Sequence, residues 1–379
     1  LTALDDLPFM DRGFVYDQTA FRYRYKRTLM ASRGCPFRCT YCFEHQWNEL
    51  YRGKGNIRQW YGVDRFLDEL KYIQRNWDTR FFKFYDDVML PFPNPAELAW
   101  HEEFCRKYPA RIGLPFHLLT RCDLVAALKR RYGINVIADW KKAGLASITM
   151  SIESGNAFIR DHIIMRDMSG AEVTEAFRMA NAAKVYTFPN VILGIPAPLV
   201  PHCPTDLEFD SKLSRVAEET KILQKLNGRK IDLAVVIGIA KDWFLEEPER
   251  RQYLLGFLRS AGLRSNYREY DKESVRFTLA QRPGFPEFPI LAPFPKTKAT
   301  DWALARGDFD GNYDKLHASY QHRSTLTCYT EREKSIQQNL ALLGSFLALF
   351  AGSRHRLMRW LGKPLEYACL EWLVEWSHP

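Results

Sequence analysis

Three cysteines lie close together in the segment SRGCPFRCTYCFEHQW (32–47), at positions Cys35, Cys39 and Cys42. Thiolate sulfur is a soft ligand that suits zinc and iron–sulfur clusters. A structural zinc site needs four protein ligands, and His45 is a candidate for the fourth. An iron–sulfur cubane held by three thiolates keeps one iron free of protein ligands, so a small molecule can bind there. The spacing therefore predicts a metal centre on this loop, either a cluster or zinc.

Composition is that of a globular protein, with 46% hydrophobic and 26% charged residues. The other five cysteines are scattered along the chain. Such usage is typical of the reducing cytosol, where a cysteine group binds metal more often than it forms disulfides, so we expect a cytoplasmic protein. The net charge of +9 is compatible with anionic partners but identifies none. We expect no leader and no membrane span, because no apolar run reaches about 20 residues.

Helical and strand patterns alternate along the first half of the chain. We expect strands over 21–32, 79–90, 114–124 and 187–196, and helices over 63–76 and 169–185. The segment 136–155 is expected to form a helix that stops at Gly144 and then a strand. Alternation of this kind predicts a parallel sheet, either open or closed into a barrel. Further on, the pattern predicts a helix over 205–228, a buried strand over 230–240, and helices over 331–351 and 355–376.

The cysteine loop resembles that of the radical S-adenosylmethionine (radical SAM) superfamily, which has the same spacing and an aromatic residue, here Tyr41, before the last cysteine. The resemblance implies that Cys35, Cys39 and Cys42 hold a [4Fe–4S] cluster. It also implies that the open iron binds the amino and carboxylate groups of S-adenosylmethionine. Reductive cleavage of this cofactor would release a 5′-deoxyadenosyl radical that abstracts hydrogen from the substrate.

The same resemblance implies cofactor contacts elsewhere in the chain. The acidic pair in FYDDV (84–88), above all Asp87, would lie near the methionine amino group, and Glu153 in SIESG (151–155) would lie near the ribose and carboxylate. Capped strand ends and buried structural acids would leave the same sequence pattern.

Arg166 would grip the methionine carboxylate, since a guanidinium binds a carboxylate through two hydrogen bonds. Gly194 in VILGIP (191–196) would let the backbone approach adenine, and Tyr41 and Phe43 would pack beside the cluster or adenine. A surface arginine and an ordinary turn glycine are the alternatives for the first two.

By this resemblance the fold is α/β, a partial parallel (β/α) barrel with a C-terminal helical extension. Its cluster loop would lie at the C-terminal mouth of the barrel, where barrel active sites form. We expect an N-terminal arm or connector over 1–28, the core barrel over 29–228, a barrel-completing and substrate-shaping region over 229–330, and C-terminal helices over 331–379.

Two further segments resemble members that carry a cobalamin-binding domain. One is LTALDDLPFMDRGFVY (1–16), and the other is APFPKTKATDWALARGDFD (292–310), which departs from the related motif at Phe294 and Lys296. The chain holds no D-x-H-x-x-G motif for a cobalt ligand. Cobalamin would therefore act only through a domain absent from this chain.

The predicted function is modification of a small molecule by methylation, cyclisation or rearrangement, with flavodoxin or ferredoxin as reductant; no catalytic residue is assigned. One alternative is an RNA-modifying radical SAM enzyme, because aromatic and basic residues alternate in FRYRYKR (21–27). We favour an amphipathic strand there, with aromatics inward and charges outward. The other alternative is a non-enzymatic zinc or cluster module. Basic and apolar residues over 353–376 also fit peripheral contact with a membrane surface.

Overall fold

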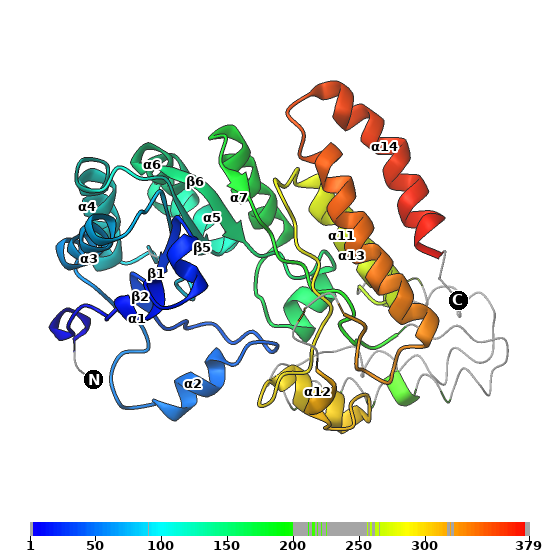
Figure 1. Ribbon diagram of the computed structural model, residues 1–379. Coiled ribbons are helices and arrows are strands. Elements are labelled where there is room, and N and C mark those ends of the chain that lie inside the picture. The colour runs from blue at the N-terminus through cyan, green and yellow to red at the C-terminus, as the bar shows by residue number, and fades with distance from the viewer. Residues whose placement is uncertain are drawn as a thin grey trace.

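The computed structural model describes residues 3–89, 91–199, 262–264, 266–316 and 322–375, together with isolated residues between them (211, 214–216, 218, 221, 225, 256, 258, 259 and 319). The strand predicted over 230–240 lies outside the described residues, as does most of the helix predicted over 205–228. Figure 1 shows the sheet and its helices in one half of the molecule and α11, α13 and α14 in the other.

The centre of the fold is a five-stranded parallel sheet with the order β1-β4-β5-β6-β7. Its strands are β1 (Lys26–Leu29), β4 (Phe81–Phe84), β5 (Phe116–Thr120), β6 (Leu145–Met150) and β7 (Tyr186–Thr187). Isolated parallel bridges continue the pairing beyond β6, from Glu153 to Val191, from Asn190 to Glu287 and from Leu193 to Ile290. The predicted α/β fold with a partial parallel barrel is confirmed.

Helices follow the strands and cover the outer face of the sheet. They are α3 (Val63–Asn76), α4 (Pro95–Arg111), α5 (Cys122–Tyr132), α6 (Val136–Ala143) and α7 (Gly170–Ala182). Ser169 caps α7 in a capping box with Glu172, as the sequence predicts. Short elements complete this half: α1 (Gly13–Tyr16), α2 (Glu44–Leu50), and the antiparallel pair of β2 (Ser32–Arg33) and β3 (Gln59–Trp60).

The two faces of the strands differ in polarity. Side chains on the helix-covered face are buried and apolar, as at Phe82, Phe116 and Ile148. The alternate residues line an interior cavity and include Lys83 and His117. A parallel sheet with both faces packed is apolar throughout, so the polar inner face indicates that this side of the sheet faces the cavity and is not packed against helices.

The strand predicted over 21–32 is shorter than expected. Only Lys26–Leu29 pairs in the sheet, while Ala20–Tyr23 forms a 3-10 turn capped by the Thr19 hydroxyl. The expected orientation was also wrong, because Tyr23 is 70% exposed and Arg27 only 1%. Arg27 is held inward because it donates to the carbonyls of Phe21 and Asp78.

The described C-terminal residues include α11 (Tyr267–Ala280), α12 (Lys298–Arg306), α13 (Glu331–Ala351) and α14 (Arg356–Glu371). Helix α13 packs against α11 and α14, whereas α12 lies apart from these three (Figure 1). The predicted helices over 331–351 and 355–376 are confirmed, although a 3-10 turn, Leu373–Glu375, follows α14. The outer face of α14 exposes apolar residues such as Leu357 and Trp360. Within the described residues no helix has the length and apolar character to cross a bilayer. Membrane-surface contact stays a prediction.

Candidate active site

The cysteine loop follows β2 and is fixed by hydrogen bonds from three other segments. The Gly34 amide donates to Asp87 Oδ2 at 2.8 Å, and Asn48 Nδ2 donates to the Cys35 carbonyl at 2.7 Å. Arg58 Nη1 donates to the Gly34 carbonyl at 3.1 Å. Gly34 itself has a φ of +85°. The loop is therefore held at the ends of β2 and β4 before any ligand binds.

The two adjacent acids of FYDDV have different surroundings. Asp86 is 1% exposed and accepts hydrogen bonds from the amides of Ala31 and Ser32 and from the Ser32 hydroxyl. Burial raises the pKa of the Asp86 carboxyl to about 6. Asp86 thus supports the entry to the cysteine loop, whereas Asp87 reaches the pocket beside it.

All three cysteines line one pocket of about 220 Å³. Five of the six predicted cofactor contacts line the same pocket: Tyr41, Phe43, Asp87, Glu153 and Arg166. Phe43 is 60% exposed, so its ring forms part of the pocket's open side. Segments far apart in the sequence are therefore brought together as the motifs predicted.

Gly194 does not line this pocket. Its amide donates to Asp271 Oδ1 at 2.9 Å, and its φ is +68°. A Cβ at this position would lie 3.1 Å from the Gln337 side chain. The glycine is required by this close approach to α13, and its contact with adenine stays a prediction.

Two guanidinium groups lie beside one cysteine. Arg121 Nη1 and Arg166 Nη1 are each 3.8 Å from Cys39 Sγ. Arg121 also pairs with Asp123 at 2.9 Å and stacks over the Phe37 ring at 3.6 Å. The two guanidinium groups therefore place fixed positive charge beside this sulfur in a buried site, where charges interact more strongly than in water.

Arg166 also connects Cys39 to a buried hydrogen-bond chain. Its guanidinium donates to the Ser151 carbonyl at 3.0 Å and to the Tyr41 hydroxyl at 3.2 Å. Tyr41 in turn donates to Glu153 Oε1 at 2.9 Å. Burial raises the pKa of Glu153, and this residue has a φ of +65°, which is strained for a residue with a Cβ. The carboxyl group of Glu153 lines both this pocket and the cavity beside it.

The thiols fit a cluster better than a single ion. Burial raises the pKa of Cys35 to about 11 and that of Cys42 to about 12. In the part of the chain that the structure describes, no three His, Cys, Asp or Glu side chains converge closely enough to hold one metal ion. His45 is buried on α2 and does not line the pocket. Three thiols spaced around a pocket match a cubane, whose irons occupy separate corners.

Sequence reasoning missed Arg121, Phe37 and Glu44, which all line the pocket. Arg121 ends a buried strand, and that position at a barrel's C-terminal edge is the signal that could have revealed it. Burial and then the charge of Asp87 raise the pKa of Glu44 to about 7. No pattern around Glu44 distinguishes it from a helix-starting acid.

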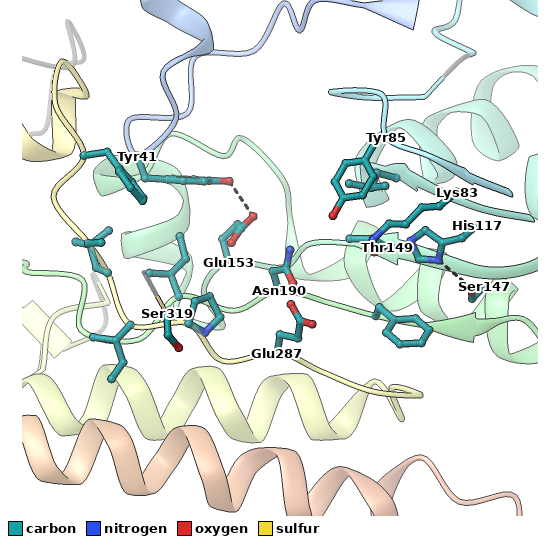
Figure 2. Close-up of a pocket in the computed structure, with 18 of the residues that line it drawn as sticks. Tyr41, Lys83, Tyr85, His117, Ser147, Thr149, Glu153, Asn190, Glu287 and Ser319 are labelled. Carbon is teal, nitrogen blue, oxygen red and sulfur yellow. Dashed lines mark hydrogen bonds between the residues drawn. The ribbon is translucent and has the colours of Figure 1, made fainter. Parts of the chain in front are cut away.

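A second, larger cavity of about 800 Å³ adjoins the cysteine pocket and shares four lining residues with it: Tyr41, Leu119, Thr149 and Glu153. Figure 2 shows Tyr41 at one side of this cavity, Lys83 and His117 at the other, and Glu153, Asn190 and Glu287 between them. The cavity follows the inner face of the sheet, so the cysteine pocket opens into the barrel interior.

The radical SAM superfamily model matches residues 29–197, which include the cysteine loop and all five parallel strands except the first three residues of β1. Residues 29–197 form a radical SAM domain. The suspected superfamily is confirmed over this segment, and a radical SAM domain indicates an enzyme. The radical SAM family implies a [4Fe–4S] cluster and S-adenosylmethionine as cofactors.

One curated relative is similar to part of this chain. Over 168 residues the chain is 27% identical to the anaerobic magnesium-protoporphyrin IX monomethyl ester cyclase of Cereibacter sphaeroides, covering 43% of this chain and 24% of the cyclase. The match thus spans about a quarter of that relative's length.

Two solved structures are among those that resemble this one over most of the chain. The match to the apo form of the cobalamin-dependent S-adenosylmethionine radical enzyme OxsB covers 92% of this chain and 51% of the OxsB chain, with 15% identity and a TM-score of 0.42. The match to methylornithine synthase (PylB) covers 86% of this chain and 69% of the PylB chain, with 11% identity and a TM-score of 0.41.

Proposed function

We propose that this chain binds a [4Fe–4S] cluster through Cys35, Cys39 and Cys42 and uses it to cleave S-adenosylmethionine reductively, for the modification of a small molecule. The observation that supports this most directly is the shared pocket. Three thiols, two arginines and Glu153 line it, and it opens into a cavity large enough for a substrate.

When bound, the cluster would supply the electron that breaks a carbon–sulfur bond of the sulfonium cofactor. The chain's own contribution begins with charge. Arg121 and Arg166 lie beside Cys39 Sγ, where they would offset negative charge added on reduction. Both arginines are buried, at 2% and 8% exposed, so solvent screens this effect little.

The remaining pocket residues would orient S-adenosylmethionine. Arg166 would bind the methionine carboxylate, since its guanidinium already faces the pocket, and Asp87 would accept from the amino group. Glu153 would accept from the ribose hydroxyls, with Tyr41 holding its carboxylate in place at 2.9 Å. Asp87 and Glu153 belong to different strand ends, so each would fix a different part of the cofactor.

The test is anaerobic reconstitution with iron and sulfide, followed by electron spin resonance of the reduced protein and an assay for 5′-deoxyadenosine. We expect a [4Fe–4S] signal that changes when S-adenosylmethionine is added. Cys39→Ala should lose both the signal and deoxyadenosine formation. Cys105→Ala is the matched control, because this thiol lies on α4 outside the pocket. A Cys39→Ala protein with full turnover, or a native protein that takes up zinc alone, would refute the proposal.

Reaction type and reductant follow from separate measurements. Methylation, cyclisation and rearrangement would each consume S-adenosylmethionine differently, so we would compare the yields of deoxyadenosine and S-adenosylhomocysteine. Flavodoxin or ferredoxin is the proposed electron donor. Cobalamin would enter through a separate domain, and its addition should leave deoxyadenosine formation by this chain unchanged.

RNA modification is a second candidate, supported by the exposed aromatic residues before β1. Phe21, Tyr23 and Tyr25 are 56%, 70% and 51% exposed, and Arg22 stacks on the Tyr23 ring at 4.7 Å. Exposed aromatic rings beside cations are the surface that single-stranded RNA uses for base stacking. Retention of tRNA that weakens with salt, and is lost in Tyr23→Ala, would favour this candidate; absence of binding at low salt would remove it.

A further inference from the structure

The barrel cavity has positive charge concentrated at the end away from the cysteine pocket. Lys26 on β1 and Lys83 on β4 both line the cavity. Thr28 pairs with Lys83 and Lys26 with Phe81, so the two lysines are diagonal neighbours on one face of adjacent strands. Within the described residues neither ammonium group lies within ion-pair distance of a carboxylate.

His117 lies next to these lysines on β5, in register with Lys83. Its ring nitrogens lie 2.8 Å from the Ser147 hydroxyl and 3.0 Å from the Thr149 hydroxyl. Burial first, and then the charges of Lys83 and Lys26, lower the pKa of His117 to about 3. The imidazole is therefore neutral at pH 7, and the lysines supply the local positive charge.

Negative charge in the cavity lies elsewhere. Glu153 is engaged with Tyr41 at the cysteine side, and Glu287 lies below Asn190 in the middle of the cavity, apart from Lys83 (Figure 2). The lysine end also has aromatic walls, since Lys83 Nζ lies 4.2 Å from the Tyr85 ring centroid and Phe188 packs edge-on against His117 at 5.7 Å. Within the described residues these two lysines have no carboxylate partner, and aromatic rings lie beside them. Such a recessed site suits a ligand that carries an anionic group on a flat or apolar skeleton.

We propose that the substrate of this enzyme carries an acidic group, a carboxylate in the first instance, which Lys26 and Lys83 bind at the end of the barrel away from the cysteines. This inference rests on the proposed function, because it names the substrate class for the same cavity. His117 lies near the start of β5, and Arg121 directly follows the end of this strand, so about 13 Å of extended chain separates the two residues. The acid group would therefore bind well away from the cysteine pocket.

The probes are 2-naphthoate and 2-naphthamide, two-ring compounds that differ only in the charged group. Calorimetric titration of the full chain should show tighter binding of the acid than of the amide. In Lys26→Gln/Lys83→Gln the dissociation constant for the acid should rise at least about tenfold, since about 1.4 kcal/mol is a factor of ten and one hydrogen bond to a charged group contributes at least that much. Binding of the amide should not change.

Two controls separate a bound acid from general electrostatics. Lys129→Gln/Lys363→Gln removes the same net charge from exposed positions outside the cavity and should bind the acid like the native chain. Glu287→Gln removes a negative charge from the cavity and should not weaken binding of the acid. A native chain that binds the acid no more tightly than the amide, including binding of neither, would overturn the proposal, as would equal losses in both double variants.

Failure of this inference is distinguishable from failure of the proposed function. The lysines do not line the cysteine pocket, so deoxyadenosine formation without substrate should survive in Lys26→Gln/Lys83→Gln. Loss of acid binding with intact cofactor cleavage supports both proposals. Intact acid binding in a protein that never assembles a cluster supports the lysine site alone.

Discussion

Replacement of Gly34 by alanine should damage the cysteine loop more than any ordinary glycine substitution. Gly34 has a φ of +85°, and a Cβ built on it would lie 1.9 Å from the Ile57 carbonyl oxygen. That oxygen belongs to the backbone just before β3, and Arg58, the next residue, donates to the Gly34 carbonyl. Relief of the clash must therefore shift the segment that holds the loop against Asp87.

The size of the effect follows from two contributions. A residue with a Cβ in the left-handed region costs about 1–2 kcal/mol. Displacing the Ile57 backbone by about 1 Å, at the expense of the β2–β3 pairing and the Arg58 contact, adds a comparable amount, so we expect Gly34→Ala to lower the free energy of unfolding by about 2–4 kcal/mol. Gly133→Ala is the matched control, because Gly133 has a φ of +70° but no atom within 4 Å of its built Cβ. It should cost only about 1–2 kcal/mol.

The assay is urea unfolding followed by tryptophan fluorescence, together with iron content after anaerobic reconstitution. Gly34→Ala should bind less iron than Gly133→Ala even where both proteins are fully folded. Equal stability losses in the two variants would mean that the clash with Ile57 is absorbed without cost. Full iron content in Gly34→Ala would show that the loop's backbone path does not matter for cluster binding.

Two further predictions concern buried charge. Burial raises the pKa of Asp271 to about 7 from its ordinary value of 3.8. Between these two values the folded chain keeps a proton on Asp271 that the unfolded chain has released. The free energy of unfolding therefore falls as pH rises through this range and levels off by about pH 8. Asp271→Asn should therefore remove about 2–3 kcal/mol of the decline in unfolding free energy between pH 5 and pH 8, and an unchanged decline would contradict the assignment. Arg121→Gln should make the cluster's reduction potential more negative in a spin-resonance titration, because it removes positive charge 3.8 Å from Cys39 Sγ. Arg130→Gln, on the exposed side of α5, should leave that potential unchanged.

Local sequence determined the chemistry of the loop. Thiolate softness and the spacing of Cys35, Cys39 and Cys42 depend only on residue type and chain distance, so no tertiary information was needed to predict a metal centre there. The helix cap at Ser169 and the helix that follows it could likewise be predicted from the sequence, since a capping box involves residues three positions apart. The alternation of helices and strands was enough to predict the parallel sheet.

Tertiary structure decided which charges surround the loop and which groups face the cavity. Arg121 reaches Cys39 across 82 residues of sequence, and no local pattern carries that information. The inward position of Arg27 depends on carbonyls of Phe21 and Asp78, which outweighed the expected alternation. Gly194 was assigned to adenine from its motif, but its surroundings come from α11 and α13, more than 70 residues away. Side-chain type sets what a residue can do, whereas packing between distant segments sets its charge state and its neighbours.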